Sequence, residues 1–278
     1  MNKINLDKLL FLLGAIVFQI SISSAFGNNR QLFIDDYTVI DSSRIVVRYS
    51  LEFVTNSNKP ETIDNDIIVL EIGSKTSKSY SYGLYKHDSI ATMNKTSAQP
   101  FFKARVPPLE VFKNYPIGTN SIVHRSSNHP EPIFIYEDSL DIHWEFLSEH
   151  KQVAGYVCQK ATAFFRGRTW YAWFTNQIPV ADGPWKFHGL PGLIIEIYDD
   201  QNHFRLTCVG LAHEKVLIKK YNWRYEKTTR EKANDYTRWC HENFFDCCKN
   251  LGIRLRISGA SEAEAKKMSI PFNPLELE

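Results

Sequence analysis

The sequence has none of the short motifs that mark common catalytic and nucleotide-binding sites. Its 278 residues contain no G-x-S-x-G, H-E-x-x-H, G-x-G-x-x-G or phosphate-binding loop. They contain no C-x-x-C pair, which argues against a zinc knuckle or a dithiol redox motif. Basic residues are not clustered and the net charge is +2, so a nucleic-acid partner is not expected. We therefore predict no catalytic residue, no metal site and no cofactor.

Long apolar runs are also scarce, and the one that occurs lies near the start of the chain. Leu9 to Ile22 gives about 14 largely apolar residues, fewer than the roughly 20 that a membrane-spanning helix needs. Lys3 and Lys8 precede this run, and Ser23-Ser24-Ala25 or Ala25-Phe26-Gly27 follows it as a small-residue cleavage site. These features predict that residues 1–27 are a cleaved signal peptide. The mature protein is expected in the periplasm, at the periphery of the outer membrane or outside the cell.

Cysteine is present, and its number suggests disulfide chemistry in an exported chain. Five cysteines leave one without a partner if the others pair. Cys240 and Cys247 share one face of an expected helix, and Cys158 or Cys208 could reach them. A bridge between the neighbours Cys247 and Cys248 is a further option. The sequence leaves the pairing open.

Aromatic residues are abundant, at 13% of the chain with six tryptophans. This content favours an aromatic sheet core or an aromatic binding face. About 250 residues follow the signal, enough for one β-rich domain over 28–278 or two small ones. Several prolines, including Pro100, Pro107, Pro108 and Pro116, predict an irregular insertion near residues 83–121.

The clearest secondary-structure pattern is a β-hairpin formed by residues 155–165 and 169–175. Arg166 and Gly167 supply the turn between two aromatic and β-branched segments. A two-residue turn places Ala163 opposite Trp170, so small and large side chains interdigitate on what we expect to be the buried face. The same register places Lys160 opposite Trp173, within reach of a cation–π contact.

The segment between this hairpin and the next is an aromatic loop punctuated by glycine and proline. Asp182-Gly183-Pro184 and Leu190-Pro191-Gly192-Leu193 are both typical of turns, and Pro191-Gly192 suits the centre of a type II turn. Trp185 and Phe187 are large apolar side chains that we expect to be buried, so we predict that the loop folds back over the sheet. Residues 193–198 and 203–211 then form a second hairpin, as an antiparallel meander requires.

Other segments complete the expected fold. Ile45 to Phe53 alternates between apolar and polar residues, which indicates a half-buried strand. Further strands are expected at 67–72, at 77–81 as an edge, at 122–136 as a hairpin, at 143–147 and at 215–221. Thr228 or Thr229 can cap a helix that runs to about Asn250. The predicted class is α+β, mainly antiparallel β: a bent open sheet or half-barrel meander with a C-terminal helix.

Four segments in this order resemble the GLPGLI family of secreted Bacteroidota proteins. They are G-Y-V-C-Q-K-A (155–161), F-R-G-R-T-W-Y-A-W-F (165–174), I-P-V-A-D-G-P-W-K-F (178–187) and G-L-P-G-L-I-I-E-I (189–197). The ending Asn273-Pro274-Leu275-Glu276-Leu277-Glu278 is similar to the usual ending of that family. The resemblance implies a signal peptide and an exported β-rich domain. It implies no agreed catalytic residues and no established activity.

The candidate ligand-binding residues are charged and aromatic side chains within these segments. Lys160, Arg168 and Glu196 either form a polar group that binds an anion or are surface and structural charges. Trp170, Trp173 and Trp185 either line a concave apolar site or belong to the core. His188 either contacts a ligand or packs the loop. The motif residues are Gly189, Leu190, Pro191, Gly192, Leu193 and Ile194, of which the glycines are expected to serve turns.

Histidines elsewhere offer only weak combinations. Asp141 and His143 lie two apart, as an acid/base or metal pair on one strand face would, but two solvent-facing residues are the simpler interpretation. The same two interpretations apply to His124 with His129 and to His203, and a functional role is again the weaker one.

These observations lead to one main functional hypothesis and two alternatives. The main one is an exported accessory protein, without identified catalysis, that binds an apolar or peptidic ligand or a membrane partner such as an outer-membrane transporter. The alternatives are a secreted hydrolase that uses a His/Asp pair and a structural envelope protein.

Overall fold

The computed structural model describes residues 32–95, 109–125, 132–250 and 268–278, together with three two-residue strands. These are β1 (Ile4–Asn5), β2 (Ser23–Ser24) and β17 (Ile253–Arg254). The predicted signal segment 1–27 therefore lies outside the described residues apart from β1 and β2, and so does His129.

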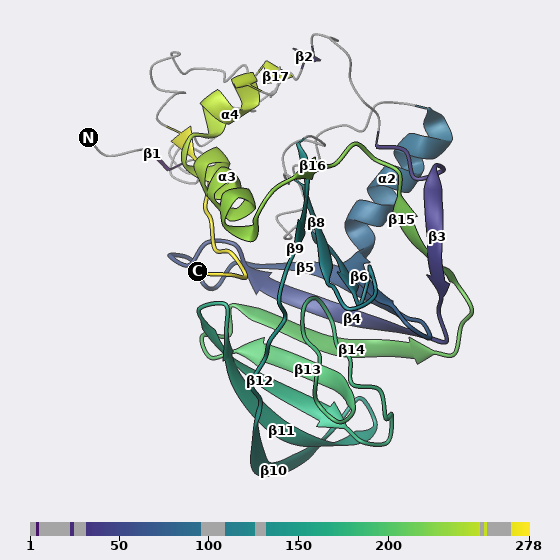
Figure 1. The fold of residues 1–278 in the computed structure, drawn as a ribbon. Coiled ribbons are helices and arrows are strands. Elements are labelled where there is room, and N and C mark those ends of the chain that lie inside the picture. Colours follow the sequence, from purple (N-terminus) through teal and green to yellow (C-terminus); the bar gives the residue numbers. More distant parts are fainter. Residues whose placement is uncertain are drawn as a thin grey trace.

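One open sheet dominates the described part of the chain (Figure 1). Neighbouring strands run antiparallel, except that β16 pairs parallel with β9. The prediction of a mainly antiparallel, open-sheet α+β fold is confirmed. In sheet order the strands are β10 (Glu145–Val153), β11 (Tyr156–Phe165), β12 (Arg168–Thr175), β13 (Leu193–Asp199), β14 (Phe204–Ala212), β4 (Ile45–Val54), β5 (Ile63–Ile72), β6 (Ser77–Ser81), β7 (Leu109–Lys113), β8 (Ser121–Arg125), β9 (Ile133–Glu137) and β16 (Glu226–Lys227).

The predicted meander is present as the run β10 to β14, in which consecutive strands pair. Its first hairpin has the expected register, with Phe165 opposite Arg168, Ala163 opposite Trp170 and Lys160 opposite Trp173. The face of Trp170 is buried, as expected, because alanines opposite the indole leave room for it. After β14 the sheet continues into β4, which comes from the beginning of the described chain.

In the described part of the chain, α2 (Tyr82–Asn94) and α3 (Arg230–Glu242) lie beside the sheet, and α4 (Phe244–Asn250) follows α3 and packs against it (Figure 1). Helix α2 contacts β5 and β6, and α3 contacts β9. A separate pair, β3 (Tyr37–Ser42) and β15 (Leu217–Tyr221), is antiparallel, and the short strand β18 (Met268–Ser269) contacts α3 and α4. Within the described segments, none of the helices is long and apolar enough to cross a membrane.

The C-terminal helix begins as predicted but does not continue unbroken. The side chain of Thr229 accepts a hydrogen bond from Lys232 N at 3.4 Å and so caps α3. The prediction of one helix to about Asn250 is wrong, because Asn243 leaves the helical conformation at φ −125° and ψ 48°. Its side-chain amide donates to Trp239 O, which satisfies a carbonyl at the end of α3.

Three boundaries also differ from expectation. Residues 83–121 are not wholly irregular, because α2 forms behind an N-cap at Ser81 and β7 follows; residues 96–108 lie outside the described part. Strand β6 is not an edge, since it pairs with both β5 and β7. Strand β10 begins at Glu145, two residues later than expected, and extends to Val153.

Most of the core is one cluster of buried side chains from the sheet strands and the loops beside them. Alternate residues of β4, among them Val47, Tyr49 and Leu51, belong to it, as the sequence pattern predicts. The loop between β12 and β13 also enters this cluster through Trp185 and Phe187. The predicted folding back of the loop over the sheet is confirmed.

Candidate functional site

The aromatic loop, residues 176–192, is held by a buried lysine of a distant strand. Lys113 Nζ, at the end of β7, donates to the carboxylate of Asp182 and to the carbonyls of Gly183 and Phe187, the latter two at 2.6 and 2.8 Å. Burial lowers the pKa of Lys113, against the effect of Asp182, which raises it. The end of the loop is tied as well, because Tyr49 on β4 donates to Ile194 O at 2.7 Å.

The two glycines of the GLPGLI segment have different structural roles. Gly189 adopts a positive φ of 92°, which side chains other than glycine rarely tolerate. Gly192 does not have a positive φ, so the predicted type II turn at Pro191-Gly192 is wrong. A Cβ there would lie 2.0 Å from Thr175 O, so this glycine permits close contact with the end of β12. Leu190, Leu193 and Ile194 are fully buried.

Rings from the loop and from the first hairpin pack against one another. The centroids of Trp170 and Phe187 lie 4.7 Å apart, those of Trp185 and Phe187 5.0 Å, and those of Phe165 and Trp185 6.1 Å. Trp170 is completely buried and therefore belongs to the core. Trp173 projects from the opposite face of β12, so the three candidate tryptophans do not share one site.

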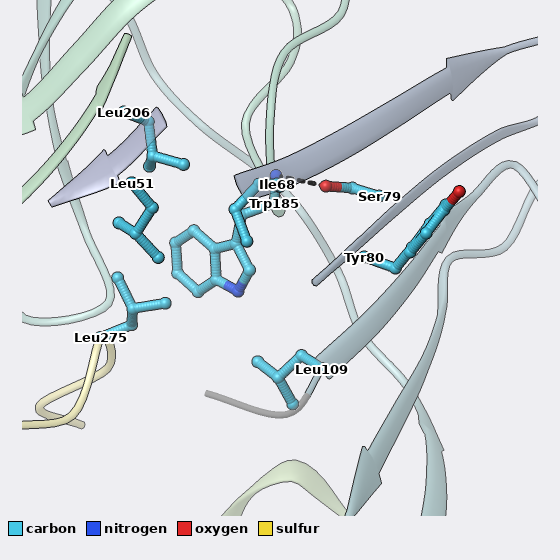
Figure 2. A pocket seen from close by; sticks show the side chains of 8 residues that line it. All are labelled: Leu51, Ile68, Ser79, Tyr80, Leu109, Trp185, Leu206 and Leu275. Atoms are coloured by element: carbon cyan, nitrogen blue, oxygen red, sulfur yellow. Dashed lines mark hydrogen bonds between the residues drawn. The ribbon is translucent and has the colours of Figure 1, made fainter. Parts of the chain in front are cut away.

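Trp185 also forms one wall of an apolar pocket (Figure 2). The pocket is narrow: its interior holds about 20 Å³, room for about one water molecule, and it is partly open to solvent. It lies at the inner face of the sheet, between strands that are far apart in the sequence. Its lining residues are Leu51, Ile68, Ser79, Tyr80, Leu109, Trp185, Leu206 and Leu275.

The indole of Trp185 carries a polar group without a partner in the described part of the chain. Its Nε1 is buried and has no hydrogen-bond partner among the described residues. Its backbone N donates to Ser79 Oγ at 2.9 Å, which fixes the position of the residue over β6. A buried N–H without a partner costs free energy, so this atom is a place for a water molecule or for an acceptor on a ligand.

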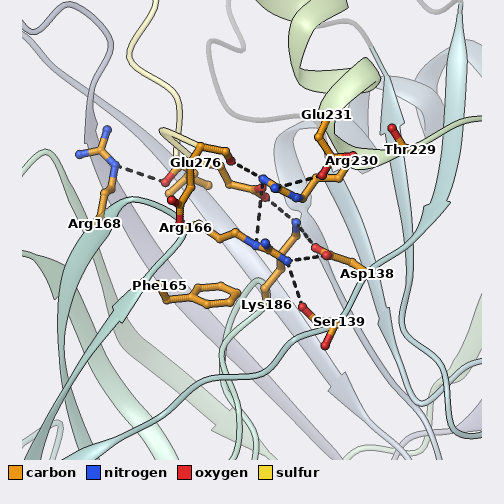
Figure 3. Close-up of polar contacts among 12 residues, drawn as sticks. Asp138, Ser139, Phe165, Arg166, Arg168, Lys186, Thr229, Arg230, Glu231 and Glu276 are labelled. Atoms are coloured by element: carbon orange, nitrogen blue, oxygen red, sulfur yellow. Dashed lines mark hydrogen bonds and ion pairs between the residues drawn. The ribbon is translucent and has the colours of Figure 1, made fainter.

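The next residue of the loop, Lys186, lies in a buried ion network (Figure 3). Its Nζ donates to Asp138 Oδ2 at 2.7 Å and to Glu276 Oε1 at 2.5 Å. Arg166 in the β11–β12 turn pairs with Asp138 at 2.5 Å, and Arg230 at the start of α3 pairs with Glu276 at 3.2 Å. Three cations thus surround two carboxylates.

The network stabilises the charged form of Glu276. Burial would raise the pKa of this carboxyl group, but Lys186 above all, followed by Arg166 and Arg230, lowers it below the ordinary value of 4.5. Nearby, burial lowers the pKa of His124 to about 4; Glu276 opposes this shift and Lys186 adds to it.

The C-terminal tail, residues 271–278, brings Leu275 to the pocket and Glu276 to the network. Arg168, which is almost fully buried, donates to Leu275 O at 3.2 Å, to Pro274 O at 2.6 Å and to Asn273 Oδ1 at 2.8 Å. It also pairs with Asp199 at 2.8 Å. We call the pocket, the network and the tail together the loop–tail site.

The structure does not bring Lys160, Arg168 and Glu196 together. Lys160 pairs with Glu149 at 3.2 Å, while Glu196 pairs with Lys151 at 2.5 Å and with Arg205 at 2.6 Å. Lys160 and Glu196 lie opposite Trp173, whereas Arg168 lies on the other face of the hairpin. Of the two interpretations of these residues, a shared anion-binding group is therefore not supported, and structural ion pairs are present instead. The expected cation–π contact is present, with Lys160 Nζ 5.7 Å from the Trp173 ring.

Among the candidate histidines that the structure describes, His188 does not form a reactive group with another. His188 accepts a hydrogen bond from Trp144 Nε1 through its backbone carbonyl at 2.8 Å, which supports a role in packing the loop. Burial and then Lys113 lower the pKa of His188. Asp141 and His143 are exposed in a segment that precedes β10, not on a strand as expected.

Cysteine pairing is resolved in part. Cys240 and Cys247 form a disulfide, and Cys158, Cys208 and Cys248 are buried free thiols. Among the described residues, no group of three or more His, Cys, Asp or Glu side chains could hold a metal ion.

Comparison with known proteins gives one family match. A family described as "Protein of unknown function (Porph_ging)" matches residues 166–196. This segment includes β12, the aromatic loop and the first half of β13, and so coincides with the centre of the loop–tail site. No curated protein matches the chain.

Solved structures give only distant likenesses. Two crystal structures of PNGF-II, in space groups C2 and P21, each have a TM-score of 0.48 and 15% identity over 73% of this chain. The chain spans 34% of their length, about a third. An uncharacterized conserved protein from Thermus thermophilus has a TM-score of 0.32 and 4% identity, over 67% of this chain and 91% of that one.

Several residues of the loop–tail site were not candidates in the sequence. Lys113, Asp138 and Arg230 lie in segments without a recognised motif, and no local pattern singles them out. The ending Asn273–Glu278 does resemble a family feature, but the sequence gives it no role. The pocket residues Leu51, Ile68, Leu109 and Leu206 look like ordinary strand residues.

Proposed function

We propose that this protein is an exported accessory protein of GLPGLI type that binds an apolar or peptidic ligand at the loop–tail site. The observation that carries the proposal is the apolar pocket beside Trp185, whose buried Nε1 has no partner among the described residues. A pocket with apolar walls and one directed polar group is a typical small binding site. The sequence features of residues 1–27 support export.

A pocket-filling variant tests ligand binding. We would isolate tagged full-length protein from its native envelope and identify retained molecules by native mass spectrometry. Leu109 lines the pocket and is only partly buried, so Leu109→Phe should fill space without disturbing the core. The expected result is a molecule that wild type retains and Leu109→Phe loses.

The matched control is Val157→Phe, at an exposed position of β11 away from the pocket. It should retain the same molecule as wild type. Equal retention by Leu109→Phe, or no retained molecule in wild type, would contradict ligand binding at this pocket.

Export has its own test. The intact mass of protein taken from the native envelope should correspond to an N-terminus at Phe26 or Asn28, after cleavage behind Ala25 or Gly27. Protein that begins at Met1 and stays in the cytosolic fraction would refute export, and the pocket experiment would then use protein from that fraction.

A further inference from the structure

The C-terminal tail is bound by the remainder of the molecule as an extended peptide would be. Residues 271–278 form no helix or strand, yet Leu275 and Glu276 are buried. Arg168 donates to two successive backbone carbonyls of the tail, and Leu277 N donates to Arg166 O at 3.0 Å. Contacts to the peptide backbone, combined with pockets for individual side chains, are the usual basis of peptide recognition.

The charges around Glu276 suit an acidic side chain in that position of a peptide. Lys186 Nζ, Arg230 Nη1 and the nearby Arg166 guanidinium converge on its carboxylate. Two other carboxylates compete for these cations: Asp138, which pairs with Lys186 and Arg166, and Glu231, which pairs with Arg230 at 3.1 Å (Figure 3). Without the tail, three cations would face two carboxylates, and one of these, Glu231, has a mostly exposed side chain, so the empty site favours an anion.

The position of Leu275 suits an apolar side chain larger than the one present. Leu275 lines the pocket together with Trp185 and Leu109 (Figure 2), and about 20 Å³ of interior space remains in the pocket. The tail therefore does not exhaust the apolar surface that the site offers. A bulkier residue would remove more apolar area from water.

We propose that the loop–tail site is a peptide-binding site that the protein's own tail occupies. Its partner is an extended peptide segment with an apolar residue followed directly by an acidic residue. This inference rests on the proposed function and names the ligand class. The tail and the partner compete, because both use Arg168 for the backbone, Lys186 and Arg230 for the acid, and the wall of Trp185 for the apolar side chain.

Competition makes the inference measurable in the full-length chain. A tethered tail acts at a high effective concentration, so wild type should bind a free peptide only to the extent that its tail is undocked. Leu275→Ala with Glu276→Gln weakens the tail without changing any residue that receives it. A labelled peptide, Asn-Pro-Leu-Glu-Leu-Glu, should then bind this variant about tenfold or more tighter than wild type in fluorescence anisotropy.

Four further measurements test the specificity of binding. The peptide Asn-Pro-Leu-Lys-Leu-Glu should not bind, because a cation would meet the cations of the site. The peptide Asn-Pro-Phe-Glu-Leu-Glu should bind more tightly than Asn-Pro-Leu-Glu-Leu-Glu. The expected gain is about fourfold for each additional CH₂-sized amount of apolar surface that the ring buries. Arg230→Gln in the same background should weaken binding of the acidic peptide. Leu277→Ala changes a residue that is 47% exposed, so this variant should bind the labelled peptide as weakly as wild type does.

The inference is overturned if a folded variant binds the acidic peptide no better than wild type does, or no better than it binds the lysine peptide. Circular dichroism establishes folding, and Glu276→Gln alone serves as the milder variant if the double change unfolds the protein. Failure here, together with a non-peptide molecule that Leu109→Phe loses, would refute peptide recognition and leave the proposed function standing. If the peptide experiment and the pocket-filling experiment both failed, peptide recognition and ligand binding at this pocket would both be refuted.

Discussion

At the scale of single residues, the GLPGLI segment is a set of packing and backbone requirements. Leu190, Leu193 and Ile194 are fully buried, Gly189 supplies a positive φ, and Gly192 lets the chain contact Thr175. The exposed members of the six are Gly189 and the proline that follows Leu190. The motif therefore fixes the loop, and the groups that could contact a ligand are the preceding tryptophan and lysine of the same loop.

If Gly192 permits a close backbone contact, Gly192→Ala should strongly destabilise the folded protein. The added Cβ would lie 2.0 Å from Thr175 O and 2.6 Å from Thr175 C, both backbone atoms that cannot rotate away. We expect a loss of about 3 kcal/mol or more in the free energy of unfolding, measured by urea denaturation. Gly210→Ala is the control, because the nearest atom to its Cβ, Arg48 Cβ, lies 4.0 Å away. Equal effects of the two changes would refute the close-contact explanation.

A second residue-scale prediction concerns His124 and pH. Its pKa is about 4 in the folded protein and 6.5 ordinarily, so the unfolded chain binds the extra proton between these values. Stability should therefore fall as the pH drops from about 6.5 to about 4, by up to about 3 kcal/mol from this group. His124→Gln cannot take up the proton and can keep a hydrogen bond to Thr237 Oγ1, now 2.9 Å from Nε2.

The measurement is the free energy of unfolding at pH 7 and at pH 4.5 for both proteins. Wild type should lose more stability than His124→Gln between the two conditions. His150→Gln, at an exposed position of β10, is the control and should behave as wild type. An equal loss in wild type and His124→Gln would show that other groups set the pH dependence.

At the scale of elements, the sequence predicts the hairpins and the folding back of the loop between them, but not the conformation of that loop. The register of β11 and β12 follows from a two-residue turn and from small residues opposite a large one, both local features. The aromatic loop instead takes its conformation from Lys113 on β7, Tyr49 on β4 and Ser79 on β6. None of these contacts is implied by the loop's own sequence, which is why the turn at Pro191-Gly192 was predicted wrongly.

Lys113→Met tests whether one lysine holds the whole loop. Methionine retains the apolar stem but leaves the Asp182 carboxylate and two carbonyls without their donor. Removing one partner of a buried pair typically costs about 3–5 kcal/mol, and we expect a loss of this size in urea denaturation. The emission maximum of Trp185, the tryptophan in the loop, should also shift to longer wavelength, as for an indole exposed to solvent.

The control for Lys113→Met is Lys95→Met, which removes an exposed pair with Asp35. Little change in stability or fluorescence is expected there, since solvent screens such pairs. A small effect of Lys113→Met would mean that the packing of Trp185 and Phe187 and the hydrogen bonds with Tyr49 and Ser79 hold the loop without the lysine.

At the scale of the whole molecule, the candidate site depends on contacts between distant parts of the chain. The pocket joins Leu51 to Leu275, and the network joins Asp138 to Glu276. The sheet itself is completed by pairing of β14 with β4, across about 150 residues. Periodicity predicts which residues face inward, but not which inward-facing residues meet. The sequence could therefore predict the open antiparallel sheet and the aromatic loop, while the pocket and the role of the tail required the structure.

Three free thiols can show whether the sheet and the C-terminal helices unfold together. Cys158 on β11, Cys208 on β14 and Cys248 on α4 are free and buried, so each reports the opening of its own region. Burial also raises the pKa of Cys158 to about 11 and that of Cys248 to about 12, which leaves little reactive thiolate while these regions stay folded.

We expect Cys248 to react with a thiol reagent at a lower urea concentration than the other two. Helix α4 packs against α3 and the short strands β17 and β18, whereas β11 and β14 have a paired neighbour on each side. Regions with few partners open before the central strands. Mass spectrometry of labelled peptides would assign each cysteine, with the Cys240–Cys247 disulfide left intact. If all three thiols reacted in one coincident transition, the helices and the sheet would be a single cooperative unit, and α3 would transmit the docking of Glu276 on Arg230 to both.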